Sequence, residues 1–214
     1  MDRTDSAATH LIPDDLAEVY EGLRREIQWL QAKWQIFCQL FVVSEEQTYL
    51  LNRKAPGFFR IVYGVLLDDV FMSLSRLIDP ARTGPKENLC LARLIELIGA
   101  SDNPEFYREI GDMQERIRSH CEPFRKRRNR TLAHSDLSTS LENHADPLPG
   151  ISIRMIKEGL QMVRDLMNCI EDQFDLPRIL YEDPIIRGDG KTLVACLREA
   201  EERGTAQDAS LEIG

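Results

Sequence analysis

The sequence lacks the features of a membrane-spanning or secreted protein. No uninterrupted apolar run approaches the roughly 18 to 20 residues that cross a bilayer, and the longest candidate, Phe58–Leu67, runs into Asp68 and Asp69. The N-terminus is polar and has no apolar segment of the kind found in secretory signals. We therefore expect a soluble, cytoplasmic protein that does not contact membranes.

Paired cysteines are also missing. The five cysteines are odd in number, widely spaced, and form no Cys-x-x-Cys pair. Four of them fall within apolar helical patterns, where cysteine usually serves as a small core residue. We therefore predict neither a disulfide framework nor a metal site, and no cofactor. The cysteines are Cys38, Cys90, Cys121, Cys169 and Cys196.

The charge is acidic overall but unevenly distributed. The chain carries a formal net charge of −9, yet the segment from Arg116 to His134 holds seven Lys or Arg residues against one acid, Glu122. An acidic protein of this kind does not coat nucleic acid broadly. A basic segment on it can still attract a polyanion locally.

Apolar periodicity in the first half of the chain predicts long helices. Apolar residues recur every three or four positions over Asp14–Val43, which indicates one amphipathic helix. Ser44 followed by two glutamates and Gln47 predicts a capped restart that runs to Lys54. Phe58–Asp79 is apolar nearly all round, so we expect a buried central helix that ends at Pro80.

The second half of the chain is also predicted to be helical, with more frequent breaks between the helices. After a loop at residues 82–87, Asn88 is a candidate N-cap for a helix that reaches Ile98. Asn103 and Pro104 begin another helix toward His134, which Pro123 should kink or split. A polar loop follows at residues 138–150. Ser152–Phe174 and Lys191–Glu202 are the last two predicted helices.

These elements predict an all-α protein, an antiparallel up-and-down helical bundle with an extra C-terminal helix. We divide it into a flexible N-terminus at residues 1–13 and a bundle at residues 14–176. A C-terminal extension with a short helix follows at residues 177–203, and a disordered tail at residues 204–214.

One short run of residues combines an arginine cluster with a histidine. Phe124–Asp136 reads Phe-Arg-Lys-Arg-Arg-Asn-Arg-Thr-Leu-Ala-His-Ser-Asp. Arg128, Asn129 and His134 in this run resemble the motif of the HEPN superfamily, an arginine followed by a polar residue and, four to six residues beyond, a histidine. Leu67–Asp79 and Ala133–Asp136 are similar to the abortive-infection U-type branch of that superfamily.

The resemblance implies a HEPN-type bundle with metal-independent endoribonuclease activity on single-stranded RNA, in phage defence or a toxin–antitoxin system. It also implies a homodimer and a possible antitoxin protein as partner. His134 would be the general acid/base, Arg128 the phosphate clamp and Asn129 the orienting group. The alternative is a non-catalytic HEPN module that binds RNA, a nucleotide or a partner protein.

Helix geometry leaves the choice of arginine open. Positions 128 and 134 lie some 120° apart on an ideal helix, whereas Arg127 and Arg130 share the face of His134 better. Arg125, Arg127 and Arg130 are therefore candidates for binding RNA phosphates. The alternative is a solvated helix end, where cations complement the helix dipole.

A polar stripe crosses the predicted central helix. Asp69, Ser73 and Arg76 follow an i, i+4, i+7 spacing within an apolar sequence. Because buried charges are costly unless they are paired, we expect the stripe to face residues 116–134. It would then form either a structural ion-pair network with the arginines of residues 116–130 or a second wall of the active cleft.

Overall fold

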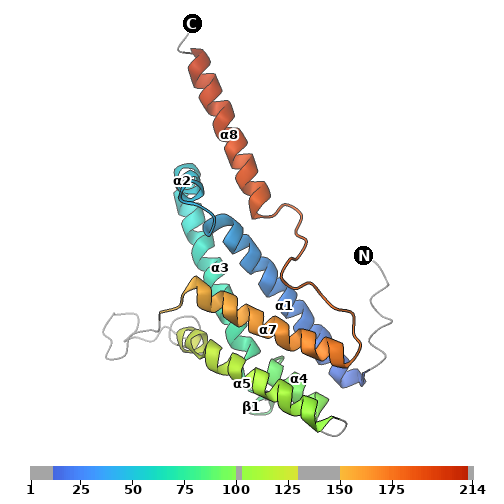
Figure 1. Cartoon of the computed structure of the whole chain (residues 1–214). Coiled ribbons are helices and arrows are strands. Elements are labelled where there is room, and N and C mark those ends of the chain that lie inside the picture. Colours follow the sequence, from blue (N-terminus) through green and yellow to red (C-terminus); the bar gives the residue numbers. More distant parts are fainter. Residues whose placement is uncertain (1–11, 100–102, 130–149, 212–214) are drawn as a thin grey trace, which may run out of the picture. The chain divides into compact units, whose positions relative to one another are not determined.

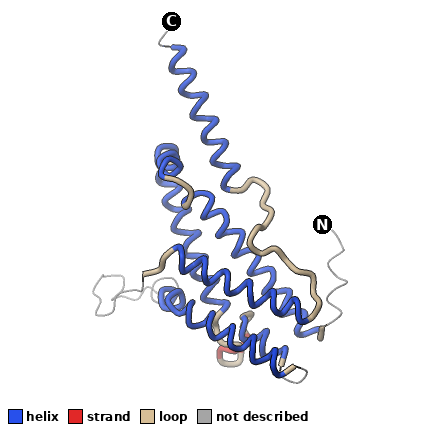
Figure 2. Tube along the Cα trace, viewed as in Figure 1, coloured by secondary structure: helices blue, strands red, loops and turns tan. Residues whose placement is uncertain are grey.

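The computed structural model describes residues 12–99, 103–129 and 150–211, and 76% of them are helical (Figures 1 and 2). Helices and one small antiparallel strand pair make up the described elements, so the predicted all-α bundle is confirmed. No helix in the described ranges is both long and apolar enough to cross a membrane. The elements are α1 (Asp14–Phe41), α2 (Glu45–Lys54), α3 (Pro56–Leu77), β1 (Arg82–Thr83), β2 (Lys86–Glu87), α4 (Leu91–Ile98), α5 (Pro104–Arg127), α7 (Ile153–Gln173) and α8 (Gly190–Leu211).

Three predicted helix starts are confirmed by their capping bonds. Ser44 Oγ accepts a hydrogen bond from the backbone N–H of Gln47 at 3.2 Å. Asn103 Oδ1 accepts from the N–H of Phe106 at 3.1 Å, and Ser152 Oγ accepts from that of Met155 at 3.2 Å. Each cap satisfies an N–H group that has no partner within its own helix.

One local prediction was wrong, and one of the two alternatives for Pro123 is excluded. Asn88 does not cap α4, which begins after Cys90. The Asn88 amide instead donates to the Pro80 carbonyl at 2.8 Å and to Thr83 Oγ1 at 2.7 Å, where it ties together the β1–β2 hairpin that stands in place of the expected loop. Pro123 does not split α5, which runs through it. Proline leaves the carbonyl of Ser119 without its helical donor, and Ser119 is exposed to water.

The chain forms two compact units, and α1 and α3 each contribute one part to both. The first unit comprises the chain up to Trp29 together with Phe71–Tyr181. In it α5 and α7 pack side by side and run antiparallel (Figure 1). Gly159 allows this approach, because a Cβ there would lie 3.3 Å from Cys121 Sγ and 3.4 Å from the His120 ring.

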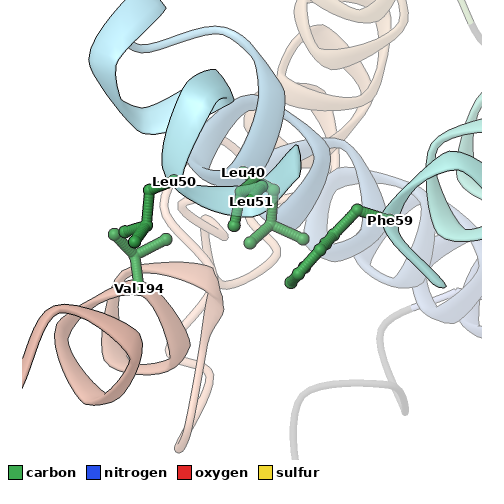
Figure 3. Packing of buried hydrophobic residues seen from close by; sticks show 5 residues of the cluster. All are labelled: Leu40, Leu50, Leu51, Phe59 and Val194. Carbon is green, nitrogen blue, oxygen red and sulfur yellow. The ribbon is translucent and has the colours of Figure 1, made fainter. Parts of the chain in front are cut away.

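The second unit comprises Leu30–Val70 and the chain from Glu182 onward. Its core joins α1, α2, α3 and α8, as Figure 3 shows. Gln47 donates to the carbonyls of Gln39 and Leu40 at 2.6 and 2.9 Å, and so satisfies acceptors in the last turn of α1. The buried core residues are Leu40, Leu50, Leu51, Phe59 and Val194.

The C-terminal helix belongs to this second unit and is longer than expected. Gln39 Oε1 accepts from the backbone N–H of Gly190 at 2.9 Å, and Gln39 Nε2 donates to Asp189 Oδ2 at 2.8 Å. These two bonds hold the start of α8 against α1. The helix continues beyond the expected end at Glu202 to Leu211, so the expected disordered tail is helical over residues 204–211.

Only the second half of α3 is largely buried, and even there Arg76 is exposed, which corrects the expectation of a buried central helix. Val70, Phe71 and Leu74 are at most 2% exposed, whereas Phe58 and Ile61 are 59% and 67% exposed. An apolar composition therefore does not mean burial here. The first half of the helix presents apolar side chains outward.

A buried carboxyl group fixes the segment that follows α7. Glu171 is fully buried, and its Oε1 accepts hydrogen bonds from Tyr181 Oη at 2.6 Å and Tyr20 Oη at 3.0 Å. Burial, together with the hydrogen bonds to Glu171 and its negative charge, raises the pKa of both tyrosines above the usual value. The cluster connects α1, α7 and the segment before α8 within the first unit.

Alkaline pH should therefore destabilise the first unit. The pKa of each tyrosine is higher in the folded than in the unfolded chain, so the protonated tyrosines stabilise the folded chain. This contribution is fully present below about pH 10 and is lost as the pH rises further. Tyr181→Phe should reduce this pH dependence and lower the free energy of unfolding at neutral pH by about 1–3 kcal/mol. Urea unfolding between neutral and alkaline pH measures both effects. Tyr49→Phe, at an exposed position, is the control, and equal pH profiles for the two variants would contradict the prediction.

Candidate functional site

The basic segment is held in place by an aromatic contact at the end of α5. Phe124 is fully buried and stacks on Phe71 of α3, with ring centroids 5.7 Å apart and an interplanar angle of 22°. The backbone stays helical through Arg128, whose N–H donates to the carbonyls of Phe124 and Arg125. The arginines that follow Phe124 therefore leave the helix in directions set by a buried anchor.

Arg128 is bound by a carboxylate that the sequence analysis did not single out. Its Nη1 donates to both Asp79 oxygens, at 3.0 and 2.9 Å. The two side chains are only 16% and 24% exposed. Arg128 Nε donates to Asn129 Oδ1 at 3.1 Å, while Nη2 donates to no group among the described residues. Two motif residues thus contact each other, and the Arg128 guanidinium is oriented by two partners, Asp79 and Asn129.

The position of Asp79 in the sequence already indicated that it could belong to the site. It closes the Leu67–Asp79 segment on which the family resemblance rests, and it lies three residues beyond Arg76, the last member of the predicted stripe. A spacing rule confined to one helix could not show which acid meets the end of α5, because that contact joins residues 49 positions apart.

The other arginines have different surroundings. The Arg127 guanidinium lies over the Phe71 ring, with Cζ 5.2 Å from the centroid, which is a cation–π contact. Arg125 Nε pairs with Glu122 Oε2 at 3.1 Å on the same helix. Arg127, which helix periodicity favoured as the phosphate clamp, is thus packed against the aromatic anchor. Arg130 and His134 lie outside the described residues.

The polar stripe of α3 contacts α1. Asp69 pairs with Lys33 of α1. Arg76 Nη2 lies 3.7 Å from Glu26 Oε2, also on α1, and 3.5 Å from Ser73 Oγ. These contacts are made to α1 or within α3, and α1 supplies the opposite charge for Asp69 and for Arg76. The stripe therefore links α3 to α1, and Asp79, which lies just beyond it, contacts Arg128.

Two further observations limit the site. His120 Nε2 lies 2.8 Å from the Met155 carbonyl oxygen, so this histidine joins α5 to α7 and has a structural role. In the part of the chain that the structure describes, no three His, Cys, Asp or Glu side chains are grouped to hold a metal ion.

The Asp79–Arg128 contact should be measurable as a coupling energy. The pair is partly shielded from water and bidentate, so we expect a double-mutant cycle of Asp79→Ala and Arg128→Ala to give about 0.5–1.5 kcal/mol. Urea titration gives the free energy of unfolding of the wild type, the two single variants and the double variant. Glu122→Ala with Arg128→Ala is the control and should be additive, because Glu122 pairs with Arg125. A coupling of zero in the first cycle would show that the contact is absent in solution.

The sequence profile of the AbiU2 family of HEPN domains matches residues 13–183, a range that includes Asp79, Arg128, Asn129 and His134. No curated protein and no solved structure gives a significant match to the chain. The match covers most of the chain and agrees with the resemblance found at Leu67–Asp79 and around His134. The chain therefore belongs to the AbiU2 family of HEPN domains.

Proposed function

We propose that the protein is a metal-independent endoribonuclease that cuts single-stranded RNA in the cytoplasm, in phage defence or a toxin–antitoxin system. Membership of the AbiU2 family, a HEPN group named for abortive infection, supports this class of function. RNA carries its own nucleophile, the 2′-hydroxyl. The protein then has only to move protons and to neutralise charge on the phosphate.

The observation that carries the proposal is the way in which Arg128 is held. Asp79 binds one terminal nitrogen of the guanidinium, and Asn129 binds Nε. The second terminal nitrogen has no partner among the described residues and retains two N–H donors. A guanidinium fixed in this way can bind a phosphate oxygen with little loss of conformational entropy, which is what a charge-stabilising group requires.

His134 supplies the proton transfer in this proposal. It accepts the proton of the attacking 2′-hydroxyl, the 2′-oxygen bonds to phosphorus, and the bond from phosphorus to the 5′-oxygen breaks. The leaving 5′-oxygen must then be protonated. Two facing copies of the motif, one in each subunit of a homodimer, would provide a base and an acid in the same turnover. A partner antitoxin protein would act by blocking this site.

The purified protein should cleave single-stranded RNA in the presence of EDTA. The products should carry 2′,3′-cyclic phosphate and 5′-hydroxyl ends, because the neighbouring 2′-oxygen is the nucleophile. His134→Ala should lower the cleavage rate by about 10²- to 10⁴-fold, the usual effect of losing a general acid/base. Analysis of product ends with a labelled oligonucleotide measures this.

An RNA with a 2′-O-methyl group at the cleaved position is the control substrate and should remain intact. His120→Ala is the control variant, because His120 joins α5 to α7 and should change stability without changing the product ends. Cleavage that persists undiminished in His134→Ala would refute the proposed chemistry.

Single replacements of Arg127 and Arg128 should show which arginine stabilises the fold and which one takes part in cleavage. Arg128→Ala should slow cleavage by about 10²-fold or more, because it removes the oriented cation. Arg127→Ala should mainly lower the thermal midpoint, because it removes a side chain packed on Phe71. Measurement of kcat and the melting temperature for both variants tests this. The reverse result would make Arg127 the phosphate clamp.

A non-catalytic binding module is the second candidate. The Asp79–Arg128 pair favours it, since an arginine already neutralised by a carboxylate can serve structure alone. In that case the wild-type protein would bind RNA at low salt without cutting it, and Arg128→Ala would lower stability and leave RNA binding unchanged.

A further inference from the structure

Trp29 on α1 is exposed to water, although tryptophan is mostly buried in folded proteins. It is 65% exposed, whereas Trp34 on the same helix is 7% exposed and stacks on Phe37. Leu23 and Ile27 are fully buried and mark the core side of α1 in the first unit. Trp29 follows Ile27 by two residues, so it points away from that core. The first unit therefore presents a large, flat aromatic ring to solvent.

Charged residues flank this ring. Arg25 and Glu26 lie one turn before Trp29 on the same side of α1, and both are exposed. Glu26 Oε2 lies 3.7 Å from Arg76 Nη2 of α3, and the Arg76 side chain is 53% exposed. Surfaces that bind proteins usually have an apolar centre from which charged residues are depleted. The surface formed by Arg25, Trp29 and Arg76, here called the Trp29 surface, instead places an aromatic ring between two arginines.

The Trp29 surface lies close to the Arg128 site within the first unit. Arg76 precedes Asp79 by three residues, and Asp79 binds the Arg128 guanidinium. The two ion pairs between α1 and α3 run in opposite chain order, so these helices are antiparallel. Trp29 therefore lies beside the turn of α3 that precedes Arg76, roughly 9 Å from Asp79 along the helix axis. A stacked single strand covers that distance in about three nucleotides, at ~3.4 Å per nucleotide.

We propose that Trp29 stacks on a base of the single-stranded RNA whose reacting phosphate lies at Arg128. Every base has a flat π-face that an aromatic side chain can bind, and a single strand leaves that face accessible. Arg25 and Arg76 bind the phosphates next to the stacked base. The inference rests on the proposed function, because it takes RNA as the molecule that occupies the Arg128 site. It adds a contact that the catalytic residues do not make.

Trp29 is a binding residue in this proposal and not a catalytic residue. Its ring contacts a base that does not change during the reaction, so it binds the substrate and the transition state equally. Loss of such a contact raises KM and leaves kcat nearly unchanged. Loss of Arg128 should instead lower kcat, because that arginine contacts the phosphate where charge develops. The ratio of the two kinetic effects therefore distinguishes the two roles.

The first test measures binding to a short single-stranded oligonucleotide with 2′-O-methyl groups throughout, so that cleavage cannot contribute. RNA should quench the tryptophan fluorescence of the wild type. It should not quench that of Trp29→Phe, because the remaining tryptophan, Trp34, is buried. By anisotropy of a labelled oligonucleotide, Trp29→Ala should bind about 5- to 150-fold more weakly, the usual effect of losing one stacked base. Trp29→Phe retains a ring and should bind nearly as well as the wild type.

Two control variants separate stacking from other causes. Trp29→Leu restores apolar area without a flat ring, so it should bind as weakly as Trp29→Ala. Tyr49→Ala removes an aromatic ring that is 66% exposed on α2 in the second unit, and it should bind like the wild type. Because Trp29 has little packing to lose, its variants should keep the wild-type melting temperature. An oligonucleotide series with one abasic position should abolish the difference between the wild type and Trp29→Ala at a single position.

The inference is overturned if RNA leaves the fluorescence of the wild type unchanged, if Trp29→Leu binds as well as the wild type, or if Tyr49→Ala shows the same loss. Cleavage of unmodified RNA separates this result from the proposed function. Binding that depends on Trp29 without any cleavage would refute the ribonuclease and leave the stacking contact in place. Cleavage with an unchanged KM in Trp29→Ala would refute the stacking contact and leave the ribonuclease in place.

Discussion

The stacking of Phe124 on Phe71 is the contact on which the candidate site depends. It joins the last turns of α5 to α3 inside the first unit, and both rings are almost completely buried. Arg127 then packs over the Phe71 ring, and Arg128 reaches Asp79 just beyond the end of α3. The aromatic pair is non-polar, but it decides where two cations of the basic segment lie.

Electrostatics explains why neighbouring arginines have such different surroundings. A run of like charges repels itself, and it is stabilised where carboxylates are interleaved or brought near by the fold. Glu122 forms an ion pair with Arg125 within α5. Asp79, just after α3, forms an ion pair with Arg128. The Asp79 pair is the more buried of the two, so it restrains its arginine more tightly. A restrained guanidinium whose second terminal nitrogen has no partner among the described residues suits binding to phosphate.

The two halves of α3 differ in their surroundings, although both are rich in apolar residues. Its second half lies in the first unit and is buried around Val70, Phe71 and Leu74. Its first half lies in the second unit, where Phe59 faces the core with Leu51 of α2 while Phe58 and Ile61 point outward. Because both halves are apolar in composition, periodicity cannot distinguish a buried side from an exposed one. Only the packing of the neighbouring helices separates them.

The sequence by itself determined most of the helices, the starts of three of them and the position of the motif. Ser44, Asn103 and Ser152 each bond to an N–H three residues away, so a local pattern was enough to predict them. The tertiary structure alone decided which acid holds Arg128, that the polar stripe of α3 meets α1, and that α8 joins the second unit. Each of these depends on contacts between residues that are distant along the chain. Such contacts are set by how apolar surfaces pack, and no periodicity within a single helix encodes that packing.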